Sequence, residues 1–172
     1  MLDQLRALVR DVPDFPQPGI TFRDITPLLG DAAGLALAVE LMANPWRTAP
    51  PDMIVGTESR GFIFGTALAR ALNRGFVPIR KPGKLPCASI QATYDLEYGS
   101  DILEMHTDAV AQGQSVLIVD DLIATGGTLQ ASRDLVQSAG GTVAGYSVLI
   151  ELEALGGRQS LEPTPVHSVL QY

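Results

Sequence analysis

Short, unbroken apolar runs recur along this chain, and stretches with helical periodicity lie between them. The runs are "MIVG", "GFVPI", "SVLIV" and "TVAGYSVLI", and the helical stretches are "GFIFGTALARAL" and "TLQASRDLVQSAG". Gly140 and Gly141 end the second helical stretch. A strand that is apolar throughout is buried on both faces, which is typical of a parallel sheet covered by helices on both sides. We therefore expect an α/β fold with a central, mostly parallel sheet flanked by helices.

The first 50 residues form an N-terminal segment of different character. "LDQLRALVRDV" has apolar residues at helical spacing until Pro13, and a second helix is expected from about Asp31 to Met42. Between them, "FPQPGITFRDITPLL" is interrupted by prolines and predicts an extended loop. A chain of 172 residues is long enough for one domain that buries roughly 70% of its unfolded surface. We therefore treat residues 1–172 as a single domain.

Residues 82–106 do not follow the alternation of strand and helix. The segment "PGKLPCASIQATYDLEYGSDILEMH" is polar, and alternating side chains lie near both of its ends. This pattern predicts a β-hairpin, or flap, with a mobile tip. Loops longer than about 12 to 15 residues in compact domains are often functional lids.

Composition and charge exclude several classes of protein. The net charge is −7, whereas a general nucleic-acid binder needs a basic face. No apolar stretch reaches the ~20 residues of a membrane span, and the N-terminus has no secretion-signal pattern, so a cytoplasmic protein is expected. The single cysteine, Cys87, excludes an internal disulfide and a cysteine-based metal cluster. A catalytic thiol would need a His or Asn partner, and none can be assigned to it.

Charged residues follow the predicted strands, and in an open α/β sheet ligands bind beyond the carboxyl ends of the strands. Half of the twelve basic residues lie between positions 60 and 84, which allows a local cationic site on an acidic protein. Two of these six, Arg70 and Arg74, are better explained as the solvated face of a helix. The residues directly after the strands are Glu58, Ser59 and Arg60; Arg80 and Lys81; Asp120 and Asp121; and Glu151 and Leu152.

The stretch "VLIVDDLIATGGT" combines an apolar strand, two acids and a loop almost without side chains. Gly126 and Gly127 leave backbone amides unobstructed, and a helix beginning near Thr128 would add its positive end, which together favour a phosphate. No lysine is present, so this is not a Walker A loop, and it does not match a dinucleotide-binding turn. Acids beside a phosphate must serve another part of the ligand, and carboxylates accept hydrogen bonds from vicinal hydroxyls. The expected ligand is a ribose 5-phosphate; the alternative is an ordinary turn in which the acids cap the next helix.

This stretch resembles the phosphoribosyl-pyrophosphate signature of the type I phosphoribosyltransferases. "RKPGKLP" and "LEYG" resemble the adenine branch of that family, as do "FPQPGITFRDITPLL", "GTESRGFIFG" and the terminal "SVLQY". The resemblance covers nearly the whole chain. It implies the type I phosphoribosyltransferase fold, with residues 1–50 as a base-binding hood and residues 82–106 as a flap. It also implies transfer of a phosphoribosyl group from 5-phosphoribosyl 1-pyrophosphate to adenine, giving AMP and pyrophosphate with inversion at the anomeric carbon.

The resemblance also implies how the site is divided. The ribose hydroxyls fall to Asp120 and Asp121, which could also stabilise the ring cation that develops as pyrophosphate leaves. Mg²⁺ is expected with the pyrophosphate, because it neutralises the leaving group; no direct protein ligand is expected, although Asp120 could contact it through water. The 5-phosphate falls to Ala124, Thr125, Gly126, Gly127 and Thr128, and the pyrophosphate to Ser59, Arg60, Gly61, Arg80, Lys81 and Lys84.

Adenine is expected at the hood. The resemblance places its 6-amino group and N1 against backbone groups of Thr21 and Arg23, with Phe22 stacked on one face and Leu152 on the other. On sequence alone, Phe22 could equally be plain core packing.

A general acid near N7 of adenine would help the transfer. In relatives that use 6-oxopurines, an aspartate in the phosphate loop has this role, but here the position is Ala124. Glu97 on the flap is the candidate acid, with Tyr98 beside it as a hydroxyl that could close over the site. The alternative for Glu97 is a solvated charge on a mobile tip.

Two other functions remain open from the sequence. The first is a non-catalytic regulator that senses phosphoribosyl pyrophosphate, but the chain has no basic recognition helix before its first core strand. The second is the same chemistry with another nucleobase, such as hypoxanthine, guanine, xanthine or orotate. Ala124 argues against the 6-oxopurines among these bases. The expected partners are adenine, phosphoribosyl pyrophosphate, AMP, pyrophosphate and a second copy of the chain in a homodimer, without nucleic acid or membrane.

Overall fold

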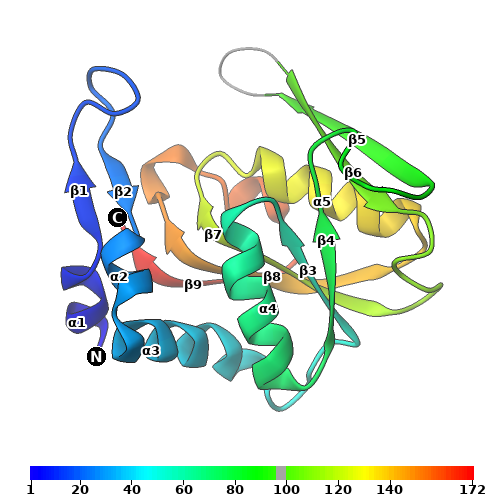
Figure 1. Cartoon of the computed structure of the whole chain (residues 1–172), viewed down its shortest axis with the longest axis horizontal. Coiled ribbons are helices and arrows are strands. Elements are labelled where there is room, and N and C mark those ends of the chain that lie inside the picture. Colours follow the sequence, from blue (N-terminus) through cyan, green and yellow to red (C-terminus); the bar gives the residue numbers. More distant parts are fainter. Residues whose placement is uncertain (96–99) are drawn as a thin grey trace.

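The unbroken apolar runs form the central sheet, as predicted. The structure is a computed structural model that describes residues 1–95 and 100–172. Five strands pair in parallel in the order β4-β3-β7-β8-β9 (Figure 1). The fifth strand, β9, is not among the predicted strands. The strands of this sheet are β3 (Met53–Thr57), β4 (Gly75–Ile79), β7 (Ser115–Ile123), β8 (Thr142–Glu151) and β9 (Val166–Gln171).

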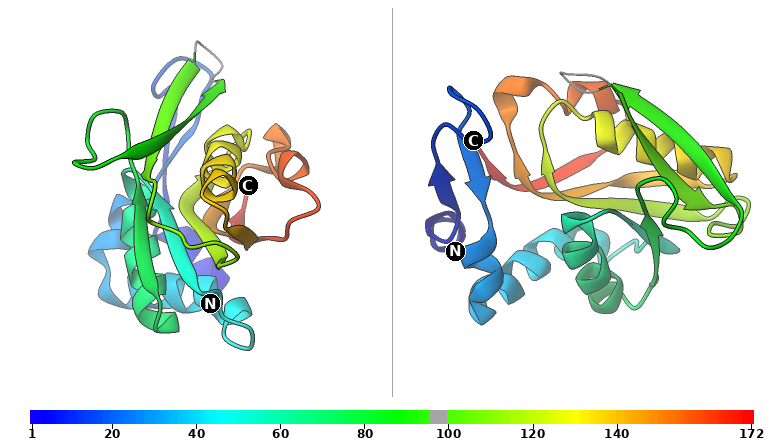
Figure 2. Two further views of the ribbon diagram at one scale, coloured as in Figure 1. Left: turned by 90° about the vertical axis from the view of Figure 1, so that its right-hand side faces the viewer. Right: turned by 45° about the horizontal axis from the view of Figure 1, so that its top comes forward.

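Helices cover both faces of the sheet, with α3 and α4 on one side and α5 on the other (Figures 1 and 2). Successive residues of β7 point to opposite faces, so Leu117 packs with the first pair of helices and Ile118 packs with α5. Both side chains are fully buried. The helices are α1 (Leu2–Ala7), α2 (Thr26–Gly30), α3 (Ala32–Ala43), α4 (Arg60–Leu72) and α5 (Gly127–Ser138), with short 3₁₀ turns η1 (Asn44–Trp46), η2 (Glu153–Leu155) and η3 (Gln159–Leu161).

The N-terminal segment differs from its prediction in two places. The first helix ends at Ala7, and the predicted continuation forms strand β1 (Arg10–Val12), antiparallel to β2 (Phe22–Asp24). This pairing places opposite charges next to each other across the two strands: Arg10 lies 3.3 Å from Asp24, and Asp11 forms an ion pair with Arg23. The loop predicted over "FPQPGITFRDITPLL" is therefore wrong for its second half, which contains β2 and α2.

The predicted hairpin between residues 82 and 106 is present as strands β5 (Ser89–Asp95) and β6 (Ser100–His106). Leu103 and Met105 of β6 are fully buried in the core on the α5 side of the sheet. A two-way backbone bridge between Arg80 and Glu104 ties the hairpin to the end of β4, with N–O distances of 2.9 and 2.8 Å. The base of the hairpin is thus anchored in the core, and the hairpin is tied to the end of β4.

Within the described ranges 1–95 and 100–172, no helix is long and apolar enough to cross a membrane.

Candidate active site

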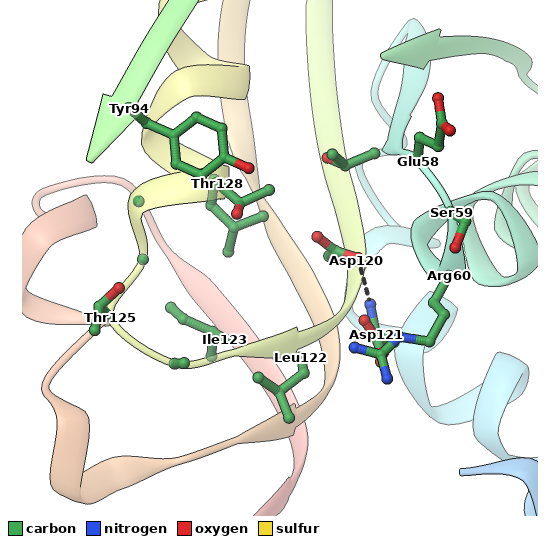
Figure 3. A pocket seen from close by; sticks show the side chains of 15 residues that line it. Glu58, Ser59, Arg60, Tyr94, Asp120, Asp121, Leu122, Ile123, Thr125 and Thr128 are labelled. Carbon is green, nitrogen blue, oxygen red and sulfur yellow. Dashed lines mark hydrogen bonds and ion pairs between the residues drawn. The ribbon is translucent and has the colours of Figure 1, made fainter. Parts of the chain in front are cut away.

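A pocket of about 330 Å³ lies at the carboxyl ends of β3 and β7, under the flap (Figure 3). It joins three segments that are far apart in the sequence: the β3–α4 turn, the flap strand β5, and the end of β7 with the loop that follows it. Its lining is Thr57, Glu58, Ser59, Arg60, Tyr94, Asp120, Asp121, Leu122, Ile123, Ala124, Thr125, Gly126, Gly127, Thr128 and Leu129. The predicted phosphate loop and the acidic pair therefore share one cavity.

The loop that follows β7 has the geometry of an anion cradle. Gly126 has φ +89°, a left-handed conformation that glycine adopts without strain, and α5 begins at the next residue. The free amide groups of the first turn of this 12-residue helix belong to its positive end, which favours an anion. Thr125 and Thr128 add hydroxyl groups to the same pocket.

The chain behind this loop holds it in place. A side chain at Gly126 would lie 2.9 Å from the backbone oxygen of Gly157 and would collide with the hydroxyl of Ser160. A side chain at Gly157 would in turn collide with the backbone oxygen of Ala124. The two segments approach so closely that only glycine fits at both contact points, which fixes the path of the cradle.

The two aspartates are buried beside this cradle. Asp120 and Asp121 are only 9% and 4% exposed. They belong to β7, which continues to Ile123 instead of ending before them as predicted. Burial raises the pKa of Asp120 well above its ordinary value, and the neighbouring charge of Asp121 raises it further. Burial also raises the pKa of Asp121, against the opposing effect of Arg60.

Arg60 joins the acidic pair to the hood. Its Nε lies 3.0 Å from Asp121 (Figure 3). Its guanidinium lies 5.5 Å from the ring centroid of Phe22. Next to it, Gly61 lets α4 start against β7, because a side chain there would lie 2.9 Å from the backbone oxygen of Val119 and 3.0 Å from Asp120. The structure thus brings the predicted base-binding strand and the predicted ribose-binding acids into contact with one arginine.

The predicted pyrophosphate-binding cations are all engaged in ion pairs. Glu58 pairs with both Arg80, at 3.2 Å, and Lys84, and it also accepts a hydrogen bond from the backbone N–H of Lys81. The hydrogen bond from Lys84 is the main reason that the pKa of Glu58 is lowered. The side chain of Lys81 pairs with Asp101 of the flap and donates to the hydroxyl of Tyr94 at 3.2 Å.

The structure describes three of the remaining predicted residues, and two lie outside the described residues. Ser59 is exposed in the β3–α4 turn, after a cis peptide bond with Glu58. Thr21 precedes β2 and is exposed, while Leu152 follows β8 and is half-buried. Glu97 and Tyr98 lie outside the described residues, so their roles stay predictions.

Sequence reasoning missed two kinds of residue at this site. It noted Glu58 at a strand end without giving it a role, and it did not single out Tyr94, which lines the pocket from β5. It also missed Gly157 and Ser160, which support the cradle from a distant segment. The pair "GG" at 156 and 157 was a visible signal of a tight turn, but only the fold shows what the turn touches.

The comparisons with known proteins agree with this geometry. The family model described as a phosphoribosyl transferase domain matches residues 31–164. The adenine phosphoribosyltransferase of Crocosphaera subtropica is 54% identical over 170 residues, which cover 98% of this chain and 99% of the relative. That of Methylococcus capsulatus is 54% identical over 171 residues, covering 99% of this chain and 100% of the relative.

Solved structures of the same kind superpose over nearly the full length. The adenine phosphoribosyltransferase of Rhodothermus marinus has a TM-score of 0.94 at 52% identity and covers 99% of this chain and 98% of its own. The Saccharomyces cerevisiae enzyme, solved with adenine and an imino-altritol bisphosphate, has a TM-score of 0.92 at 39% identity and covers 98% and 97%.

Proposed function

The chain belongs to the phosphoribosyl transferase family and transfers the phosphoribosyl group of phosphoribosyl pyrophosphate to adenine, and we propose here how its side chains divide this reaction. The products are AMP and pyrophosphate, so the enzyme salvages a free purine base. The observation that carries the assignment of the site is the joint position of a buried acidic pair and a glycine-based anion cradle at the end of β7. The two groups suit the diol and the 5-phosphate of one ribose phosphate.

The cradle from Ala124 to Thr128 binds the 5-phosphate through backbone amides and threonine hydroxyls. Asp120 and Asp121 accept hydrogen bonds from the ribose hydroxyls. The bond between the anomeric carbon and pyrophosphate breaks as N9 of adenine attacks from the opposite face, so the ribose ring carries positive charge in the transition state. Two carboxylates held close to that ring stabilise the charge, and their fixed position means that little reorganisation is needed.

The leaving pyrophosphate falls to the β3–α4 turn and to the base of the flap. Ser59, Arg60 and Gly61 approach it from the turn, and Arg80, Lys81 and Lys84 approach it from the flap side. Because these lysines and Arg80 are paired with Glu58 and Asp101 in this structure, pyrophosphate competes with two carboxylates for them. This competition favours release of the product.

The carboxylate of Asp120 and the oxygens of the pyrophosphate suit a Mg²⁺ ion that arrives with the substrate. Among the described residues, no three His, Cys, Asp or Glu side chains form a cluster that could hold a metal by themselves. Asp120 is buried, its pKa is raised by burial and by Asp121, and a nearby cation would favour its charged form. Asp120 would hold a water of the ion, and the ion would neutralise charge on the leaving pyrophosphate.

Adenine lies between Phe22 and Leu152 in this proposal. Backbone groups of Thr21 and Arg23 read its 6-amino group and N1, so selectivity depends on the position of the backbone at β2. Adenine that carries its proton on N7 attacks through the free N9, and Glu97 takes up the N7 proton as the N9 bond forms, so that Glu97 is the general acid at N7 in the reverse direction. Tyr98 closes over the site. The enzyme is proposed to act as a homodimer in the cytoplasm; light scattering on the purified protein would measure the mass, and cell fractionation the location.

The decisive assay follows pyrophosphate release with Mg²⁺, phosphoribosyl pyrophosphate and each nucleobase in turn. Adenine is expected to support turnover, whereas hypoxanthine, guanine, xanthine and orotate are not. Equal turnover with a 6-oxopurine would contradict the proposed reading by Thr21 and Arg23. Glu97→Gln should lower kcat far more than it weakens substrate binding, and an unchanged kcat would end its proposed role as the acid.

A further inference from the structure

The two walls of the proposed adenine site come from different parts of the fold. Leu152 follows β8 of the main sheet, whereas Phe22 and Arg23 belong to β2, which pairs only with β1 among the described strands. That ladder has three paired positions. Because an isolated two-stranded sheet is marginally stable, side-chain contacts must fix β2 against the main sheet.

Tyr172 contacts both walls. Its backbone N–H donates to the carbonyl of Glu151 at 3.0 Å, and its carbonyl accepts from the N–H of Glu153 at 3.0 Å, so these two bonds flank Leu152. Its ring lies under the guanidinium of Arg23, 4.1 Å from the ring centroid, and under that of Arg6 at 4.6 Å. The C-terminus accordingly lies beside β2 (Figure 1).

The ring of Tyr172, and not its hydroxyl, makes these contacts. The ring is half-buried against the core beneath the hood, and burial raises the pKa of the phenol. The hydroxyl oxygen is buried and has no hydrogen-bond partner in the part of the chain that the structure describes. A cation over an aromatic face is held more strongly when the pair is withdrawn from water, so the contact with Arg23 restrains that residue.

We propose that Tyr172 is a positioning residue for adenine: its backbone fixes Leu152 on one side of the base and its ring fixes Arg23 of β2 on the other. This proposal rests on the adenine site proposed above. The ring of Tyr172 thus sets the distance between the two walls of that site. The same ring would not affect the phosphate cradle, which belongs to the loop after β7 and is supported by Gly157 and Ser160.

Loss of the ring should loosen β2 without detaching the hood. Ile25 and Leu28, directly after β2, are 2% and 0% exposed and remain anchored in the core. The backbone hydrogen bonds of Tyr172 do not depend on its side chain. The expected defect is therefore a less well-ordered base site in a folded enzyme.

The test compares two variants of Tyr172 by steady-state kinetics with Mg²⁺. Tyr172→Leu should raise the KM for adenine about tenfold, the scale of one buried cation–π contact, and should leave the KM for phosphoribosyl pyrophosphate within twofold. Tyr172→Phe keeps the ring and should behave as the unmodified enzyme does. The proposal is overturned if Tyr172→Leu leaves the KM for adenine unchanged, if both KM values rise together, or if Tyr172→Phe is as defective as Tyr172→Leu.

Further variants separate the possible causes. Trp46→Leu removes a half-buried aromatic ring from the opposite end of β8, where it packs on Gly145, and should lower the melting temperature without changing either KM. Asp11→Asn breaks the ion pair of Arg23 but keeps its contact with the ring, so the KM for adenine should stay within twofold. A selective rise in the KM for adenine with either of these variants would contradict the proposal.

Two more variants cover failure to fold and failure of the site itself. Arg23→Met keeps the backbone groups of Arg23 but removes its guanidinium from the ring, so it should reproduce the selective rise even if Tyr172→Leu proves insoluble. Phe22→Ala tests the adenine site directly. If Phe22→Ala raises the KM for adenine and both Tyr172→Leu and Arg23→Met do not, only the role of Tyr172 is overturned; if Phe22→Ala has no effect, the site and the role of Tyr172 both fall.

Discussion

Substitution of Gly126 by alanine should damage phosphate binding more than it damages stability. Gly126 has φ +89°, and a left-handed conformation costs an L-residue about 1–2 kcal/mol. In a chain of 172 residues that cost lowers the melting temperature by about 2–8 °C, since 1 kcal/mol corresponds to about 2–4 °C at this size. The added methyl group would also lie 2.9 Å from the backbone oxygen of Gly157, which must move and take the cradle with it.

Gly113 provides a matched control for this experiment. It has φ +80°, nearly the same backbone strain, and a side chain there would meet no atom within 4 Å. Gly113→Ala should therefore lose only stability. Gly126→Ala should lose stability and also raise the KM for phosphoribosyl pyrophosphate at least tenfold, which is about 1.4 kcal/mol.

The assay combines thermal denaturation with initial-rate kinetics on both variants. A KM for phosphoribosyl pyrophosphate in Gly126→Ala that stays within twofold of the value in Gly113→Ala would refute the reasoning. In that case the path of the backbone at Gly126 would not control the cradle.

Three further predictions concern charge. Because the pKa of Asp120 is raised in the folded state, its charge destabilises the fold at pH 7. Asp120→Asn should therefore raise the melting temperature at pH 7, and this gain should vanish below the ordinary pKa of 3.8. The same variant should weaken the binding of phosphoribosyl pyrophosphate. The pKa of Glu58 is lowered, so its pairs stabilise the fold fully above the ordinary pKa of 4.5. Glu58→Gln should cost no more than about 1 kcal/mol at pH 7, because Arg80 and Lys84 are partly exposed, and this cost should shrink as the pH falls below 4.5 through the lowered pKa. Chelation of Mg²⁺ should stop pyrophosphate release, and added Mg²⁺ should restore it; full activity in the chelator would contradict the proposed role of the metal.

The sheet and the cradle could be predicted because their signals are local. The apolar runs at β3, β4, β7 and β8 indicate burial on both faces, and the glycine at 126 indicates a backbone conformation that requires glycine. Both patterns lie within short continuous segments, so the sequence alone is enough to recognise them.

The features that were missed depend on partners far away in the sequence. Arg10–Val12 continues a helical pattern but forms a strand because β2 is available to pair with it. Glu58 could be placed at a strand end, but its choice of Arg80 and Lys84 depends on how the flap folds back on the sheet. No local pattern carries such information, so the ion-pair network needed the structure.

The most direct test of the account is a crystal structure of the enzyme with AMP. The account predicts the 5-phosphate on the backbone amides between Ala124 and Thr128, and the ribose hydroxyls on Asp120 and Asp121. A nucleotide whose phosphate lies elsewhere, with that loop empty, would contradict it.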